Sequence, residues 1–218
     1  MHTLDFHPKV TYLIGENGVG KSTLIEAVAV AWGFNPEGGS INFRFATRET
    51  HSALHEYITL VRGTRRPRDG FFFRAESYYN LATEIDALDS EPSFGPRLRR
   101  SYGGRSLHEQ SHGESFFAAF MHRFGGEGLY ILDEPEAALS PVRQMAMLAR
   151  MHELVKTRSQ FIVATHSPIL MAYPDAVIYH LAPDGIETRR LEETSHYIVM
   201  KQFLNHKDKM LRELFGEE

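Results

Sequence analysis

Residues 10–23 read Val-Thr-Tyr-Leu-Ile-Gly-Glu-Asn-Gly-Val-Gly-Lys-Ser-Thr, a short apolar run followed at once by a glycine-rich stretch. From Gly15 to Ser22 every fixed position of the phosphate-binding P-loop is matched. Glycines allow a tight turn that brings several backbone N–H groups to one phosphate cluster, at the positive end of the next helix. The stretch therefore predicts a nucleotide-binding site between a strand over 10–14 and a helix over 21–32.

Each polar residue of this loop has an expected role in binding a nucleoside triphosphate. Lys21 is expected to reach the β- and γ-phosphates, and the Ser22 hydroxyl to hold Mg²⁺. The residues expected to contact the nucleotide are Gly15, Glu16, Asn17, Gly18, Val19, Gly20, Lys21, Ser22 and Thr23.

Length and composition favour one folded domain over residues 1–218. The chain has 218 residues, of which 42% are hydrophobic, and this is enough for a sizeable core. It contains no cysteine, which excludes disulfides, thiolate metal sites and cysteine nucleophiles. No run of 18 apolar residues and no signal-like N-terminus is present, so we expect a cytoplasmic protein without a transmembrane segment.

Positive charge is concentrated in the middle of an acidic chain. The net charge is −4, yet residues 44–105 hold eleven arginines against eight acidic residues. Arginine favours phosphate and carboxylate partners, so the arginines predict contact with nucleic acid, nucleotide or an acidic protein, the alternative being a solvated loop. The two densest clusters are Arg62, Arg65, Arg66 and Arg68, and Arg97, Arg99, Arg100 and Arg105.

Hydrophobic periodicity alternates between strand-like and helix-like segments. Continuous apolar runs are typical of strands buried on both faces of a parallel sheet. Expected strands are 10–14, 70–74, 129–132, 161–164, 176–181 and 185–190, and expected helices are 21–32, 114–123, 141–156 and 197–204. The alternation predicts an α/β, three-layer P-loop NTPase sandwich with a mostly parallel sheet. Residues 35–110 interrupt it and predict an irregular or helical inserted subdomain carrying the arginine clusters.

Two later strands end in groups suited to phosphate hydrolysis. The run Leu-Tyr-Ile-Leu-Asp-Glu over 129–134 delivers two carboxylates to the carboxyl edge of the sheet. Asp133 is expected beside Mg²⁺, and Glu134 is expected to activate water as a general base. The strand over 161–164 leads to His166, which is placed to bond the γ-phosphate or align the water.

A further motif precedes the helix that follows the arginine-rich region. Residues 110–115 read Gln-Ser-His-Gly-Glu-Ser. Serine and glycine at a helix start form an anion site, because the N–H groups there are unpaired and the helix dipole is positive.

The order of these motifs resembles the ATPase domain of the ABC superfamily over nearly the whole chain. The sequences at 15–22, 111–116 and 131–140 are most similar to those of small stand-alone bacterial "predicted ATPase" proteins of the AAA-labelled, ABC-type group. The resemblance implies ATP and Mg²⁺ as ligands, with 15–22 as Walker A, Asp133 and Glu134 as Walker B and His166 as the switch histidine. It further implies a signature motif over 111–114, whose Ser111, Gly113 and Glu114 would contact ATP, and a D-loop over 137–140.

The same resemblance implies a dimer. In such ATPases the signature motif caps the nucleotide held by a second subunit. The chain carries one copy of each motif, so an ATP-dependent head-to-tail homodimer with two enclosed nucleotides is expected.

The chain departs from the family pattern at several positions. His112 replaces a glycine, and Glu114 stands where transporters often have glutamine. No glutamine suits the Q-loop position; Glu76 is the best substitute and a further candidate Mg²⁺ ligand, with a solvated strand-end acid as the alternative. Phe6 or Tyr12 is the candidate for stacking on adenine, and the choice between ATP and GTP stays open.

The motifs favour a soluble ATPase that acts as a switch on an unidentified macromolecule. A transporter ATP-binding subunit is the second interpretation, since no glutamine-bearing loop for a membrane partner is found. A compact nucleic-acid-linked ATPase of DNA repair or defence remains open through the arginines, whereas the long coiled-coil type needs hundreds more residues. A P-loop kinase is disfavoured, because Glu134 and His166 suit water as the acceptor.

Overall fold

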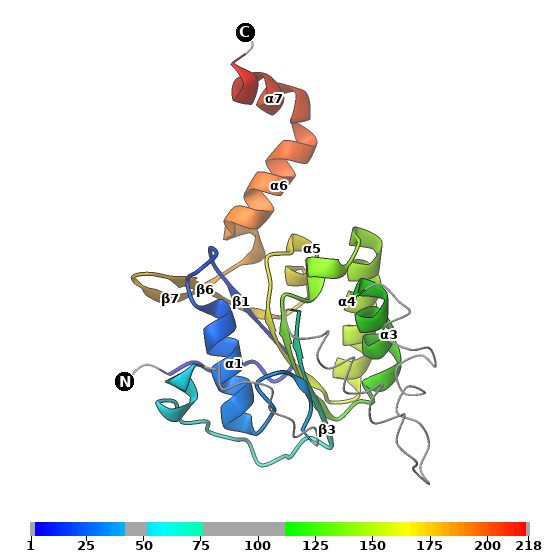
Figure 1. Ribbon diagram of the computed structural model, residues 1–218. Coiled ribbons are helices and arrows are strands. Elements are labelled where there is room, and N and C mark those ends of the chain that lie inside the picture. Colours follow the sequence, from blue (N-terminus) through cyan, green and yellow to red (C-terminus); the bar gives the residue numbers. More distant parts are fainter. Residues whose placement is uncertain (1–2, 42–51, 76–111, 217–218) are drawn as a thin grey trace.

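A mixed, mostly parallel sheet forms the centre of the computed structural model, which describes residues 3–41, 52–75 and 112–216 (Figure 1). Among these residues the sheet has seven strands in the order β2-β3-β4-β5-β1-β6-β7. The strands are β1 (Val10–Ile14), β2 (Gly39–Ser40), β3 (Asp69–Arg74), β4 (Gly128–Asp133), β5 (Gln160–Ala164), β6 (Val177–Ala182) and β7 (Gly185–Arg189).

The five inner strands are parallel, and the two edge strands are antiparallel to their neighbours. β1 lies between β5 and β6, with Leu13 in register with Ala164 on one side and Tyr179 on the other. All five residues of β1 are buried, as expected for a strand covered on both faces. Because the inner strands are parallel, the loops after β1, β4 and β5 meet at one edge of the sheet.

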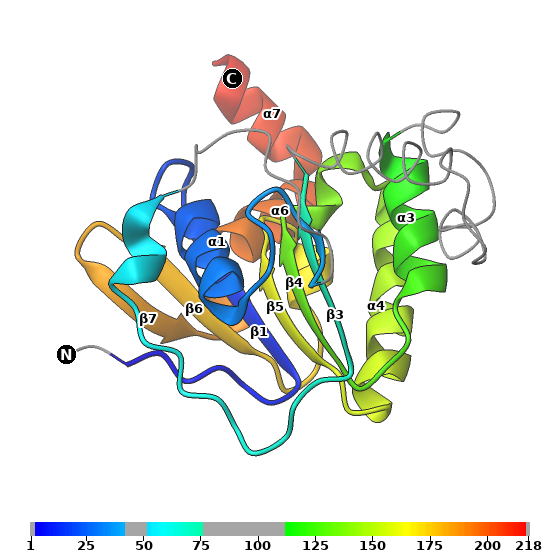
Figure 2. The ribbon, with the colours of Figure 1, turned by 60° about the horizontal axis from the view of Figure 1, so that its bottom comes forward.

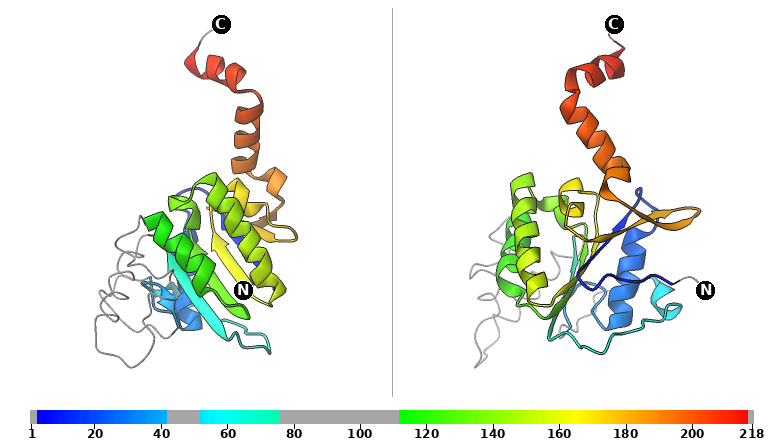
Figure 3. Two further views of the ribbon diagram at one scale, coloured as in Figure 1. Left: turned by 90° about the vertical axis from the view of Figure 1, so that its right-hand side faces the viewer. Right: turned by 180° about the vertical axis from the view of Figure 1, so that it is seen from behind.

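Helices cover both faces of the sheet and give three layers (Figure 3). Side chains alternate along each strand, so Leu129 and Ile131 of β4 pack with α1 on one face, while Tyr130 and Leu132 join the core on the other. The second face carries α3 and α4. The α-helices are α1 (Lys21–Trp32), α3 (His112–Arg123), α4 (Pro141–Lys156), α5 (Pro168–Met171), α6 (Ser195–Asn205) and α7 (Lys207–Phe215).

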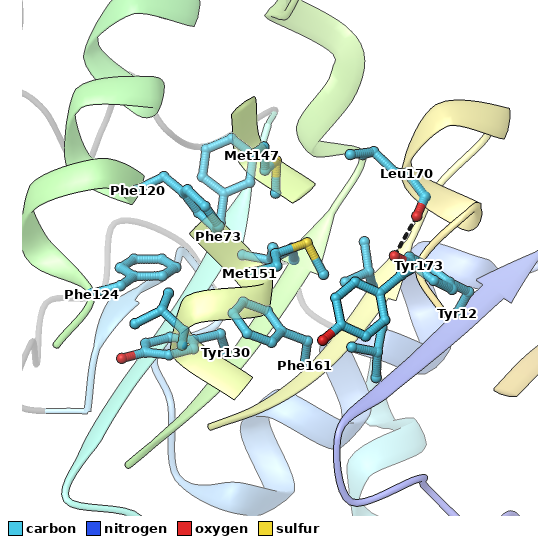
Figure 4. Packing of buried hydrophobic residues seen from close by; sticks show 14 of the residues in the cluster. Tyr12, Phe73, Phe120, Phe124, Tyr130, Met147, Met151, Phe161, Leu170 and Tyr173 are labelled. Atoms are coloured by element: carbon cyan, nitrogen blue, oxygen red, sulfur yellow. Dashed lines mark hydrogen bonds between the residues drawn. The ribbon is translucent and has the colours of Figure 1, made fainter. Parts of the chain in front are cut away.

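The core beneath α3 and α4 is rich in aromatic rings (Figure 4). The Phe124 and Tyr130 rings stack with centroids 4.2 Å apart. Tyr12 of β1 is fully buried in the same core, and its hydroxyl donates a hydrogen bond to the backbone carbonyl of Leu170. The idea that Tyr12 stacks on adenine is therefore wrong, because β1 turns this ring into the core. Phe6 is partly buried against the core on the α1 face.

The strands and long helices expected from the sequence are confirmed, with changes of one or two residues at some ends. Shorter elements were missed: β2, α5, and four-residue or shorter 3₁₀ helices at η1 (Ala53–Glu56), η4 (Pro135–Ala138) and η5 (Leu191–Glu193). Such pieces are too short to show a period. Within the predicted insertion over 35–110, β2 and β3 belong to the main sheet, and 42–51 and 76–111 lie outside the described residues.

The chain ends in α6 and α7, which extend away from the sheet (Figure 1). α6 starts close to the edge where the loops after β1 and β5 meet, and α7 continues outward. The sequence predicted the helix at α6 but not α7. Within the described parts of the chain, no helix combines the length and apolar character that crossing a membrane requires.

Candidate nucleotide-binding site

The P-loop turns sharply after β1 because of its glycines. Gly15 has φ 149°, and a Cβ added there would stand 2.4 Å from the carbonyl oxygen of Leu181 on β6. Gly18 and Gly20 also have positive φ, at 80° and 99°. Only glycine combines this backbone with so close an approach to the neighbouring strand. The turn leads directly into the first residue of α1, as the sequence predicts.

Lys21 is held in the loop by the backbone. Its Nζ donates hydrogen bonds to the carbonyl oxygens of Gly15 at 2.9 Å and Glu16 at 3.0 Å. The residue is buried, and this burial lowers the lysine pKa, while the carboxylates of Glu134 and Asp133 act in the opposite direction. A lysine held over the loop between backbone oxygens is placed to contact phosphate oxygens.

Ser22 follows β1 and Asp133 ends β4, and the two side chains meet although these strands are not neighbours. β5 lies between β1 and β4, yet the Ser22 hydroxyl donates a hydrogen bond of 3.1 Å to Asp133 Oδ1. Adjacent oxygens of an octahedral Mg²⁺ shell with bonds of about 2.1 Å lie roughly 3 Å apart, so this oxygen pair fits two neighbouring ligand positions. No cluster of three or more metal-binding side chains is found among the described residues. Mg²⁺ is commonly held by one or two carboxylates together with substrate phosphates and water, and Asp133 with Ser22 would supply the protein's part of such a set.

Glu134 stands at the C-terminal end of β4 with a left-handed backbone, φ 49° and ψ 53°. Its N–H donates to the Ala164 carbonyl oxygen at 3.0 Å, which ties the turn to β5. Its carboxylate is 40% exposed and lies 3.5 Å from Nε2 of His166. A carboxylate at the sheet edge beside the P-loop is placed to accept a proton from water.

His166 is fixed by contacts on three sides. Its backbone N–H donates to the Glu136 carboxylate, Nε2 faces Glu134, and Nδ1 lies 2.9 Å from Nε2 of His196 on α6. Sequence reasoning identified His166 but missed His196. The only signal was that His196 is one of twelve histidines, without a motif around it.

Burial affects the charge state of these groups. It lowers the pKa of both His166 and His196, and the nearby Lys21 ammonium lowers both further. Burial raises the pKa of the Glu136 carboxyl, against the hydrogen bond from the His166 N–H. At neutral pH the two imidazoles are therefore uncharged.

The proposed signature residues do not join this cluster. Ser111 lies outside the described residues, as does Glu76, the candidate for the Q-loop position. Gly113 lies in the first turn of α3, and Glu114 pairs with Arg143 of α4 at 3.5 Å. Both helices cover the face of the sheet opposite α1. On the P-loop itself, Glu16, Asn17, Gly18 and Thr23 are exposed.

The first arginine cluster lies at the other end of the sheet, because residues 57–68 lead into the start of β3 (Figure 2). The Arg62 guanidinium sits 4.4 Å above the Trp32 ring and donates to carbonyl oxygens at the end of α1. Arg68 pairs with Glu127 at 3.1 Å. Arg65 and Arg66 are exposed. The second cluster, over 97–105, is outside the described residues.

A P-loop after the inner strand β1, with carboxylates at the end of β4 two positions away, defines a P-loop nucleoside triphosphatase. Family models described as "AAA domain" and "AAA domain, putative AbiEii toxin, Type IV TA system" match residues 2–84 and 74–172. The sequence is 26% identical over 209 residues to an uncharacterized ABC transporter ATP-binding protein of Mycobacterium tuberculosis, covering 84% of this chain and 58% of that protein. It is also 24% identical to an ABC transporter ATP-binding/permease protein of the same organism, covering 81% of this chain and 21% of that protein. The chain thus spans little more than half the length of the first relative.

Solved structures with some similarity to this chain have low identity and TM-scores below 0.5. The head domain of SMC from Thermotoga maritima has a TM-score of 0.41 at 17% identity, covering 86% of this chain and 92% of that one. A dimeric ATP-binding cassette bound to ADP and Pi has a TM-score of 0.46 at 13% identity, covering 88% and 89%. The motifs and the matches to AAA domains and to ABC transporter ATP-binding proteins together support an ABC-type ATPase domain.

Proposed function

We propose that this protein binds Mg-ATP in the P-loop and hydrolyses it with water, using the ATP-bound state as a switch on a macromolecular partner. The observation that carries the proposal is the hydrogen bond between Ser22 and Asp133, which brings two oxygen ligands together beside Lys21. We place this activity in the cytoplasm, since a chain without cysteine fits a reducing compartment.

The roles of the site residues follow from their positions. P-loop amides and Lys21 bind the phosphates, and Ser22 and Asp133 hold Mg²⁺, which supplies charge neutralisation at the γ-phosphate. Glu134 accepts the proton of the attacking water, while His166 orients the water or the phosphate. For Glu76 a role at the metal stays a proposal.

The proposal includes a head-to-tail homodimer closed by ATP. Each chain has one P-loop and one signature segment, and three of the four signature positions lie in the first turn of α3, on the sheet face opposite α1. Ser111, Gly113 and Glu114 are therefore assigned to the ATP of a second copy.

Light scattering of Glu134→Gln, with and without Mg-ATP, tests the dimer, and the hydrolysis rate of the same variant tests the general base. The variant should keep ATP binding, lose turnover and double its mass with Mg-ATP. Lys21→Ala is the matched control, because it should bind no ATP and keep the monomer mass. If Glu134→Gln stays a monomer at saturating ATP, the proposed dimer is contradicted. If this variant hydrolyses ATP at the wild-type rate, Glu134 is not the general base.

A second candidate is the ATP-binding subunit of a membrane transporter. It is favoured by the M. tuberculosis relatives, which are named as an ABC transporter ATP-binding protein and an ABC transporter ATP-binding/permease protein. Purification of the tagged chain from membranes extracted with mild detergent distinguishes the two, since a transporter subunit should bring an integral membrane protein with it in fixed ratio.

A third candidate, a nucleic-acid-linked ATPase, is supported by the exposed side chains of Arg65 and Arg66. Turnover should then rise with added DNA or RNA and lose this stimulation steeply with salt. The Arg65→Ala/Arg66→Ala variant should lose the stimulation but keep basal turnover.

A further inference from the structure

A second histidine, His196, lies beside His166 at the same edge of the sheet. It lies in the first turn of α6, and its Nε2 is 2.9 Å from Nδ1 of His166. Both rings are partly buried, and their centroids are 5.0 Å apart at 56°. A nitrogen–nitrogen distance of this size is a hydrogen bond, so one of the two atoms carries the proton.

The start of α6 is anchored so that His196 keeps this position. The buried Thr194 caps the helix: its hydroxyl accepts from the N–H of Tyr197 at 3.3 Å and donates to the Leu191 carbonyl oxygen at 2.7 Å. The cap satisfies an N–H of the first turn that has no partner within the helix. His196 is thus presented to His166 by a fixed helix end and not by a free loop.

The neighbours of His166 decide which atom holds the proton. Nε2 of His166 lies 3.5 Å from a Glu134 oxygen, which can only accept when ionised. A proton on Nε2 points a donor at this carboxylate, and at a γ-phosphate oxygen when ATP is present. The opposite tautomer would turn a lone pair toward the same negative groups. With Nε2 protonated in the neutral ring, Nδ1 is an acceptor, and His196 Nε2 must donate to it.

We propose that His196 is a positioning residue, whose Nε2–H bond to Nδ1 of His166 holds the His166 ring with Nε2–H directed at the γ-phosphate and the attacking water. This inference rests on the proposed hydrolysis of ATP. Charged or titratable groups around the pair come from every adjoining element: Lys21 and Glu16 from the P-loop region, Glu134 and Glu136 after β4, and His180 from β6. The lysine charge opposes an imidazolium here, so the pair acts in its neutral form.

Two substitutions of His196 separate a hydrogen bond from simple packing. His196→Phe keeps an aromatic ring and removes the donor, whereas His196→Gln keeps an N–H at a comparable reach. We expect His196→Phe to lower kcat at least about tenfold, the size of effect seen when a supporting group is removed from a functional ligand, with KM for ATP nearly unchanged. His196→Gln should recover most of kcat. Wild-type kcat in the Phe variant, or equal losses in both variants, overturns the proposal.

A double variant tests whether His196 acts through His166. In a His166→Ala background, adding His196→Phe should change kcat no further, because the interaction it supports is already gone. A multiplicative second loss contradicts the positioning role.

A spectroscopic measurement reads the tautomer without catalysis. Long-range ¹⁵N–¹H spectra of the ¹⁵N-histidine-labelled protein at pH 7.5 should show a neutral His166 with its proton on Nε2, assigned by its loss in His166→Ala. The His196→Phe variant should populate the other tautomer. A proton on Nδ1 of His166 in the unsubstituted protein refutes the inference. If the unsubstituted protein does not hydrolyse Mg-ATP, the proposed function is contradicted, but the tautomer measurement still reports on the histidine pair.

Discussion

The Ser22 hydroxyl donates a 3.1 Å hydrogen bond to the Asp133 carboxylate across 111 residues of sequence. Ser22 lies at the start of α1, which follows β1, and Asp133 ends β4, which is separated from β1 by β5. A hydroxyl and a carboxylate at this separation would supply two of the six oxygens of an octahedral Mg²⁺ shell. The proposed metal site therefore depends on the order of the strands.

Removing the serine oxygen should weaken the use of Mg²⁺. We expect Ser22→Ala to raise the Mg²⁺ concentration for half-maximal ATPase activity about tenfold or more, because one of the few protein oxygens at the metal is lost. Ser22→Thr, which keeps the hydroxyl, is the control and should stay close to wild type. An unchanged Mg²⁺ titration for Ser22→Ala would show that Ser22 is no metal ligand.

Glycine at position 15 should matter far more for stability than glycine at 18. The Cβ of Gly15→Ala would meet the Leu181 carbonyl oxygen at 2.4 Å, whereas nothing lies within 4 Å of a Cβ at Gly18. Both positions have positive φ, so Gly18→Ala isolates the backbone strain of about 1–2 kcal/mol. We expect Gly15→Ala to lose clearly more free energy of unfolding than Gly18→Ala in urea titrations. Equal losses would mean that β6 moves away without cost.

The buried hydroxyl of Tyr12 is structural, and its removal should reduce stability without changing nucleotide affinity. Tyr12→Phe removes this donor from the Leu170 carbonyl oxygen, which still accepts from the Tyr173 N–H at 3.3 Å, so the expected cost is that of one hydrogen bond, about 0.5–1.5 kcal/mol. Urea unfolding followed by circular dichroism measures this loss, and fluorescent ATP-analogue binding measures affinity. Tyr57→Phe is the control, because Tyr57 is 82% exposed. A large fall in nucleotide affinity for Tyr12→Phe would contradict the structural role.

Acid should destabilise the fold through the histidine pair. Both His166 and His196 have a pKa below their ordinary value of 6.5, so the unfolded chain binds protons more readily below that pH. Stability due to the pair is therefore complete above about pH 6.5 and is lost as the pH falls below it. The raised pKa of Glu136 works in the opposite direction, because there the folded state binds the proton more readily.

A comparison of variants isolates the histidine contribution. Urea midpoints of the wild type and His196→Phe should be measured at pH 7.5, 6.5 and 5.5. The variant has one neutral imidazole fewer, and Glu136 is present in both, so its midpoint should fall less on acidification. Parallel pH profiles would assign the acid sensitivity to other groups.

Much of the secondary structure and of the candidate site could be predicted from neighbouring residues. The strand, turn and helix over 10–32 follow from neighbouring residues alone, since apolar β-formers precede glycines that permit the turn and a helix-forming run follows it. The same holds for α4, whose bounds follow from Ser140 at the N-cap and Pro141 in the first turn. Lys21, Asp133, Glu134 and His166 were also predicted to share one sheet edge, because the ends of parallel strands meet there.

The sequence did not predict which core a buried side chain enters or which residues of distant elements it contacts. Periodicity marks β1 as buried on both faces, but does not tell which core receives Tyr12. His196 approaches His166 only because η5 and the Thr194 cap bring α6 back to the sheet edge. The sequence by itself determined a P-loop, its acidic strand end and their chemistry, since these depend on contiguous residues. The burial of Tyr12 and the histidine pair could be seen only in the tertiary structure, because each depends on which distant elements pack side by side.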